Sequence, residues 1–97
     1  MAGGAGDEVR VQERRPGAYD VEVARGGRTV TTHHVEVPDG YAVALGLGEV
    51  GEEELVGASF AFLLEREPPG SILRRFRLDV IERYFPEYPA EIGRYLV

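Results

Sequence analysis

Three short segments near the start of the chain alternate between apolar and polar side chains, and this pattern constrains the fold more than any other feature. The positions on one face are Val9 and Val11, then Tyr19, Val21 and Val23, then His33 with the apolar Val35 and Val37. Side chains point to opposite faces along a strand with a period of two, so each segment is typical of a half-buried strand. Arg15-Pro16-Gly17 and Gly26-Gly27 separate the segments as turn signals. We therefore predict a three-stranded antiparallel sheet.

The register decides which side chains share a face of this sheet. The apolar faces of the first two strands match only if their loop is odd in length, such as Arg15–Gly17. A two-residue turn at Gly26-Gly27 would send Val35 to the opposite face. Either an odd loop or a β-bulge corrects this, and we expect a bulge near Thr32–His34.

The chain after Pro38 is expected to be mainly helical. Residues 41–47 fit either a fourth strand or a short helix capped by Asp39, and we favour the helix. A longer helix should begin near Glu52, where acidic side chains suit the positive end of the helix dipole, and end near Arg66, ahead of Pro68. Its apolar residues cover more than one stripe, which indicates that most of its surface is covered.

Three shorter elements should follow this helix. We expect Ser71 to cap a turn over residues 72–76. Asp79 and Glu82 have the spacing of a capping box, which predicts a helix over residues 80–85. Pro89 suits the first turn of a last helix that reaches Leu96.

These elements place the chain in the α+β class, as a β-β-β sheet followed by an α-α-α helical layer. Residues 1–7 are rich in Gly and Ala and are expected to form a disordered tail, which leaves residues 8–97 as a single domain. No apolar run approaches the roughly 20 residues that a membrane span needs. The first residues lack the basic and apolar regions of a secretory signal, so we expect a cytoplasmic protein without membrane contact.

The absence of several residue types excludes much chemistry. The chain contains no Cys and no Lys, so disulfides, thiol nucleophiles and Schiff bases are excluded. Ser71 lies in no nucleophile-elbow motif, and helix capping accounts for it. We interpret Glu52–Glu54 as a solvated start of the long helix, and Glu65 and Glu67 as its exposed end. A catalytic pair of acids would need a cleft, for which a chain of 97 residues has little room. We expect no enzymatic activity and no cofactor.

His33 and His34 are the one pair that could support a small metal-dependent enzyme, with Glu36 or Asp20 completing the site. Adjacent strand residues point to opposite faces, so one ion is not easily held by both imidazoles. No HExxH or Cys/His spacing accompanies them. We therefore interpret both as ordinary strand residues and keep the metal enzyme as an alternative.

The densest basic cluster is the strongest functional feature of the sequence. It consists of Arg74, Arg75, Arg77 and Arg83. These side chains interleave with Phe76 and Tyr84, as on many nucleic-acid-binding surfaces. A net charge of −6 disfavours binding to phosphates, so pairing with carboxylates is the simpler interpretation. Asp79 and Arg83 have the spacing of a helix-surface pair.

Arginine and tyrosine are also enriched where proteins bind one another. We therefore predict a contact surface for a protein partner that combines the arginine cluster with Tyr84, Tyr88 and Tyr95. Self-association is also expected, through a different surface. A three-stranded sheet leaves its first strand, with Val9 and Val11, at an open edge that a second copy could cover. The partner is thus a protein or a second copy in a homodimer.

The block from Leu55 to Tyr88 contains the pieces ASFAFLLEREP, SILRRF and IERYFPEY. In these pieces the chain resembles short uncharacterised proteins of GC-rich bacteria, over about a third of its length. The resemblance implies no activity and assigns no functional residue. The sequence thus predicts a small non-enzymatic interaction or accessory module. A nucleic-acid-associated regulator that uses the arginine and aromatic residues is the main alternative.

Overall fold

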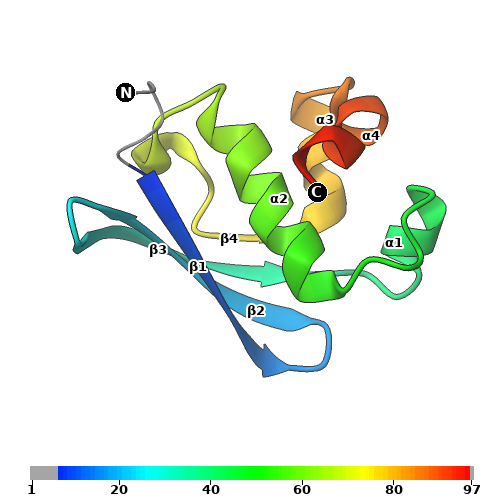
Figure 1. Ribbon diagram of the computed structural model, residues 1–97, viewed down its shortest axis with the longest axis horizontal. Helices are drawn as coiled ribbons and strands as arrows, with labels where there is room; N and C mark the ends of the chain where they lie inside the picture. Colours follow the sequence, from blue (N-terminus) through cyan, green and yellow to red (C-terminus); the bar gives the residue numbers. More distant parts are fainter. Residues whose placement is uncertain (1–6, 97) are drawn as a thin grey trace.

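A four-stranded sheet forms one layer of the protein in a computed structural model that describes residues 7–96 (Figure 1). The strands follow the order β1-β2-β3-β4 across the sheet. Their bounds are Asp7–Arg15 for β1, Ala18–Arg25 for β2, Arg28–Glu36 for β3 and Arg75–Arg77 for β4. The first three strands are antiparallel, as predicted, whereas β4 pairs with β3 in parallel. The α+β class is confirmed, and the sheet is mixed rather than purely antiparallel.

The fourth strand corrects the turn that was expected over residues 72–76. A 3-10 helix, η2, occupies Pro69–Ser71 and ends where Ser71 was expected to begin a turn. The backbone then becomes extended at Ile72 and enters β4. Residues 1–6 of the expected tail lie outside the described residues, and Asp7 pairs with Arg25 as the first residue of β1.

Two bulges bring the apolar faces of the hairpins together. The first hairpin has a two-residue turn and not the expected odd loop. A register shift between Glu13 and Arg15 instead brings the apolar side chains of both strands to the same face. The second turn is Gly26-Gly27, with positive φ at both glycines, which is the type I′ geometry that hairpins favour. A bulge does follow it, but at Val30 rather than near Thr32–His34, because the register shifts between Val23 and Ala24.

The helical residues form one long helix, α2, and several single turns. α1 covers Tyr41–Ala44 and α2 covers Glu52–Leu64, so the helix was the right choice for the start of residues 41–47. Gly40, and not Asp39, precedes α1. The remaining elements are η3 over Leu78–Val80, α3 over Ile81–Tyr84, α4 over Tyr88–Glu91 and η4 over Ile92–Tyr95.

The predicted capping box is wrong. Neither α3 nor η3 has a side-chain cap. The Asp79 carboxylate instead accepts hydrogen bonds from Arg77, and the Glu82 carboxylate accepts one from the Tyr41 hydroxyl. Asp79 is therefore used in a local contact and Glu82 in a tertiary one, while Pro89 does lie in the first turn of α4 as expected.

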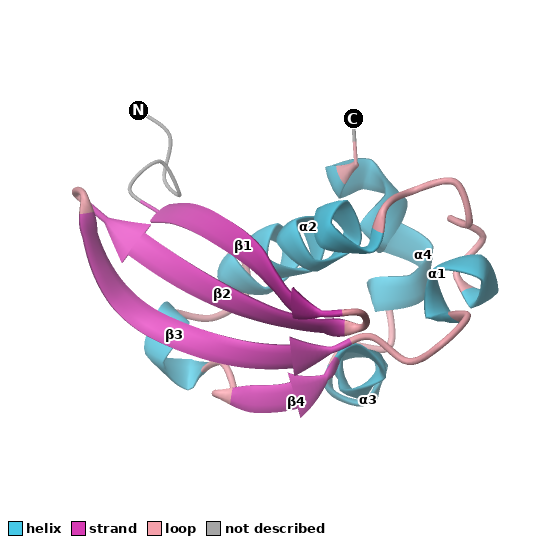
Figure 2. Cartoon of the chain, turned by 90° about the horizontal axis from the view of Figure 1, so that it is seen from below, coloured by secondary structure: helices cyan, strands magenta, loops and turns pink. Residues whose placement is uncertain are grey.

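The helices cover one face of the sheet, as Figure 2 shows from the uncovered side. The core between the layers combines inward strand residues such as Val21, Val23 and Val35 with Phe60 and Phe62 of α2. The broad apolar surface of α2 is explained by this position, because the sheet lies on one side and the C-terminal helices on the other. None of the helices within residues 7–96 has the length and apolar character needed to cross a membrane.

Candidate partner-binding groove

The four arginines of the predicted contact surface are placed on two different elements. Arg75 and Arg77 flank the buried Phe76 in β4, so their side chains point to the uncovered face of the sheet. Arg74 immediately precedes β4, and Arg83 belongs to α3. All four are exposed. Among residues 7–96, Arg77 is the one member with an ion pair, at 2.7 Å from Asp79, so the expected pairing of Asp79 with Arg83 is wrong.

The three tyrosines differ in their availability to a partner. Tyr84 is 67% exposed and lies at the surface as expected. Tyr88 is fully buried, which corrects its expected place at the surface. Its hydroxyl lies 2.7 Å from Ser59 Oγ, and Ser59 Oγ donates in turn to the Leu55 carbonyl at 2.7 Å. Burial is the main cause that raises the pKa of Tyr88, to about 12. Tyr88 is thus a polar link within the core.

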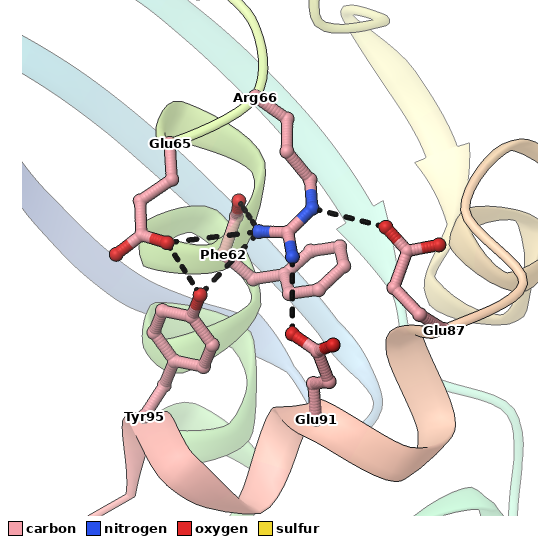
Figure 3. Close-up of polar contacts among 6 residues, drawn as sticks. All are labelled: Phe62, Glu65, Arg66, Glu87, Glu91 and Tyr95. Carbon is pink, nitrogen blue, oxygen red and sulfur yellow. Dashed lines mark hydrogen bonds and ion pairs between the residues drawn. The ribbon is translucent and has the colours of Figure 1, made fainter.

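Tyr95 belongs to a cluster around Arg66 that joins the end of α2 to the last helices (Figure 3). Its hydroxyl donates to Glu65 Oε1 at 2.6 Å and accepts from Arg66 Nη1 at 3.4 Å. Arg66 also donates to Glu87 Oε2 at 3.2 Å and to Glu91 Oε1 at 3.1 Å.

The guanidinium of Arg66 is held by α2 as well. Its Nη1 donates to the Phe62 carbonyl at 3.0 Å, and its central carbon lies 3.6 Å from the centroid of the Phe62 ring. A hydrogen-bonded cation stacked on an aromatic ring is strongly fixed. Because its polar groups are used within the chain, we interpret the Arg66 cluster as a structural clamp, not as a binding site.

His33 and His34 point to opposite faces, as their adjacent positions in β3 predict. His33 is fully buried, with Nδ1 at 2.7 Å from the Leu73 carbonyl and Nε2 at 2.9 Å from Thr31 Oγ1. A carbonyl can only accept, so Nδ1 carries the proton and the neutral ring is fully hydrogen-bonded. Burial lowers the pKa of His33, which favours this neutral form. His33 therefore ties β3 to the segment that leads into β4.

His34 lies on the uncovered face, with Nδ1 at 2.7 Å from Asp20 Oδ1. The same carboxylate group lies 3.4 Å from Arg14 Nε. Within residues 7–96, no group of three or more His, Cys, Asp or Glu side chains is arranged to hold a metal ion. The metal-dependent alternative consequently gains no site in the described part of the chain.

A shallow polar depression of about 210 Å³ lies on the uncovered face. Arg75 and Arg77 line it together with acidic and basic residues of β1, β2 and β3. Three of its four arginines are already ion-paired, since Arg14 pairs with Asp20, Arg15 lies 3.6 Å from Glu36, and Arg77 pairs with Asp79. A surface of mixed charge is a poor site for the phosphates of a nucleic acid.

An apolar groove of about 320 Å³ lies between the end of α2, the segment from η2 to β4, and α3. Its apolar lining consists of Leu63, Ile72, Leu73, Phe76, Val80, Ile81, Tyr84 and Phe85. Two of these side chains are largely exposed at its rim, Leu73 at 48% and Tyr84 at 67%. Arg74 and Arg83 are the sequence neighbours of these two rim residues. Two of the predicted arginines thus follow or precede a rim residue in the sequence, although neither lines the groove.

Glu67 is the one acidic residue in the lining of this groove. Its carboxylate makes no hydrogen bond or ion pair among the described residues, and burial raises its pKa. An acid in such a place favours either protonation or a hydrogen-bond donor from outside.

Sequence reasoning missed Glu67 and Leu73 as groove residues. Glu67 was interpreted as the exposed end of the long helix, and Leu73 as part of a helical turn. The one available signal was the pair Ile72-Leu73, whose two apolar side chains point in opposite directions if the backbone is extended.

The chain matches no family model, no curated protein and no solved structure. The resemblance of the Leu55–Tyr88 block to short bacterial proteins stays a prediction.

Proposed function

We propose that this protein is a non-enzymatic interaction module that binds a segment of a partner protein in the groove beside Tyr84. The observation that carries the proposal is the joining of an apolar groove to two exposed apolar side chains, Leu73 and Tyr84, at its rim. Large apolar side chains gathered at a concave surface are typical of protein-binding sites.

The charges around the groove favour a partner segment with acidic residues. Arg74 and Arg83, the sequence neighbours of the two rim residues, are exposed and make no ion pair among the described residues, although the chain as a whole carries a net charge of −6. Unpaired cations beside an apolar groove suit a segment in which an apolar anchor is flanked by Asp or Glu. The apolar anchor would supply affinity, and the flanking carboxylates would set orientation.

The nucleic-acid alternative has weaker support. It needs the arginines on the sheet face, where Arg77 already pairs with Asp79. Arg74 and Arg83 lie on separate elements rather than along one basic stripe. We expect no mobility shift with single-stranded RNA or duplex DNA at low salt.

The groove can be tested by selection from a library of random peptides displayed on phage, with the full chain as the target. We expect enriched peptides to combine a large apolar residue with nearby Asp or Glu. One such peptide is then titrated into the ¹⁵N-labelled protein. The amide shifts should concentrate at Leu73, Ile81 and Tyr84.

Variants distinguish the groove from exposed apolar surface in general. Leu73→Asp should weaken binding of the selected peptide at least tenfold, about 1.4 kcal/mol. Val43→Asp is the matched control, because Val43 is 69% exposed and lies outside the groove. Failure to enrich any common pattern, or equal binding by wild type and Leu73→Asp, would contradict the proposal.

A further inference from the structure

β1 is a long edge strand with no neighbour on its outer side among the described residues. It runs over Asp7–Arg15, and β2 is its one partner in the sheet order. The opposite edge, β4, has three residues and exposes Arg75 and Arg77, so two copies of it would bring like charges together. Short edges with charged side chains resist pairing, whereas a long edge can accept another strand.

The register shows which backbone groups of β1 are free. The His34 N–H donates to the Arg74 carbonyl at 2.7 Å, so the backbone of His34 faces β4. Along a strand, the N–H and C=O groups of successive residues point alternately to the two neighbouring strands. Asp20 pairs with His34, so its backbone groups face β1, and so do those of Glu22. Glu22 in turn pairs with Arg10, whose backbone groups therefore face β2. It follows that Val9 and Val11 direct their N–H and C=O groups away from β2, toward the open edge.

The order of charges along β1 favours a second copy as the occupant of this edge. The strand begins with Asp7 and Glu8 and ends with Arg14 and Arg15. Two antiparallel copies that pair Val11 with Val11 form a regular ladder over residues 9–13, and Glu8 of each copy then lies across from the other copy's Arg14, the bulge residue at the end of that ladder. Opposite charges across a strand pair are stabilising, and like charges are destabilising.

Neighbouring registers lack this complementarity. Hydrogen bonds can form only between residues whose backbone groups face the edge, so the register can shift only in steps of two. One step in one direction places Arg10 opposite Arg10, and one step in the other places Arg10 opposite Arg14. The alignment centred on Val11 is therefore the one that the charges select among these.

The helix above β1 leaves room along the line where the two β1 strands would meet, which we call the seam. A Cβ atom at Gly57 of α2 would lie 3.7 Å from Val11 Cγ2, so α2 crosses close above the centre of the strand. Ala61, one turn further on, is exposed. Small side chains on this side of α2 allow a second α2 to approach, and Val9 and Val11, which are half-buried here, would be covered on both sides.

We propose that two copies of this chain join their β1 edges in antiparallel orientation around Val11, which forms one continuous eight-stranded sheet. The sheet order β1-β2-β3-β4 in each copy then places the two β4 strands, and with them the two grooves, at the outer ends. The dimer does not depend on the proposed function of the groove.

Sedimentation equilibrium of the full chain tests the seam through a charge exchange. Glu8→Arg and Arg14→Glu should each weaken the dimer about tenfold, because each places like charges opposite one another twice. The double variant Glu8→Arg/Arg14→Glu restores opposite charges and should return the dissociation constant to within about twofold of wild type. Thr32→Arg, a charge change on the same sheet face in β3, should leave the dimer unchanged.

A backbone variant tests the same seam independently. Val11→Pro removes an N–H that faces the open edge and that no strand within the chain uses, so the monomer should fold while the dimer is lost. Amide exchange adds a third measurement, since the Val11 N–H of wild type should become more protected as protein concentration rises. A wild-type monomer at concentrations up to about 1 mM, or a dimer that the single charge reversals leave intact, would overturn the proposal.

Discussion

Residues 7–36 and residues 65–96 are stabilised in different ways. The first region consists of two hairpins whose strands pair along nearly their whole lengths. Hydrogen bonds between the backbones of neighbouring strands therefore hold this region together. In the second region no helix or strand exceeds four residues. Helices this short are not stable alone, so side-chain contacts must fix them.

These side-chain contacts are few and specific. Arg66 clamps α4 and η4 to α2, Tyr88 bonds to Ser59, and His33 holds the Leu73 carbonyl. Single substitutions should therefore act strongly on the C-terminal region, while the hairpins should tolerate changes on their exposed face. The groove lies in the region that depends on side chains, which makes its shape sensitive to the same contacts.

The largest expected effect is the loss of Tyr88. Tyr88→Ala should lower the free energy of unfolding by about 4 kcal/mol, because it empties a fully buried aromatic position. Tyr88→Phe should cost about 1 kcal/mol, since it removes only the hydrogen bond to Ser59. Urea denaturation measures both, with Tyr84→Ala as the exposed control expected within about 0.5 kcal/mol of wild type. Equal effects of Tyr88→Ala and Tyr84→Ala would remove the basis of the comparison.

The second effect concerns the link between the two regions at His33. His33→Ala should cost about 2–3 kcal/mol, because it opens a cavity and leaves the Leu73 carbonyl without its donor. His34→Ala, on the uncovered face, is the matched control and should cost less than about 1 kcal/mol.

The pH dependence of stability tests the same residue, because the lowered pKa of His33 predicts that the protein becomes less stable as the pH falls. The pKa of His33 is lower in the folded state than its ordinary value of 6.5, so the unfolded state binds the proton first. The contribution of His33 is then fully present above pH 6.5 and is lost as the pH falls below that value. Thermal unfolding of wild type and His33→Ala between pH 8 and about pH 5 should differ in slope; parallel curves would contradict the assignment.

The third effect is local to the clamp. Arg66→Ala should cost about 2 kcal/mol through the lost hydrogen bonds and ring contact, and Arg66→Lys should recover less than half of it, because an ammonium cannot match the planar fork. Amide exchange should rise in residues 88–95 and stay unchanged in β2 and β3. Arg94→Ala, an exposed arginine in η4, controls for the change in charge. Uniform loss of protection over both regions would show that the clamp is not local.

The smallest effect is expected at Glu67 in the groove. Burial raises its pKa, so its ionised form disfavours the folded state and stability declines as the pH rises above its ordinary value of 4.5. Glu67→Gln should raise the free energy of unfolding at pH 7 by about 0.5 kcal/mol and flatten this decline. Glu65→Gln is a poor control because Tyr95 donates to Glu65, so Glu53→Gln in the exposed first turn of α2 serves instead.

The same contrast explains what could be predicted from the sequence. Alternation is a local signal, so the three strands and the shared face of Val9, Val11, Val21 and Val23 followed from it directly. α2 was also predictable, because its acidic first turn and Pro68 mark its ends. The position of the second bulge was not, since any single extra residue between Gly27 and Val35 restores the same faces.

In the C-terminal region the deciding contacts are made by side chains, and those of Glu82 and Tyr88 join residues far apart in the sequence. Asp79 and Glu82 have capping-box spacing, yet the Asp79 carboxylate accepts hydrogen bonds from Arg77 and the Glu82 carboxylate accepts one from Tyr41. Tyr88 packs into the core, and its hydroxyl bonds there to Ser59, which lies 29 residues earlier. The strand β4 is three residues long, too short for alternation to identify. Of the residues that the sequence predicted as a contact surface, only Tyr84 lines the groove.

The parallel pairing of β4 with β3 also sets an order of folding. The two hairpins join neighbouring residues, whereas β4 can pair only after the whole of α1 and α2 has been brought back across the sheet. Contacts between residues distant in sequence are slow to form, so we expect the walls of the groove to assemble last. The element that docks last is also the one that can detach without unfolding the rest. The groove would then open at a lower free energy than global unfolding, and the His34 amide, bonded to the Arg74 carbonyl, would report that opening.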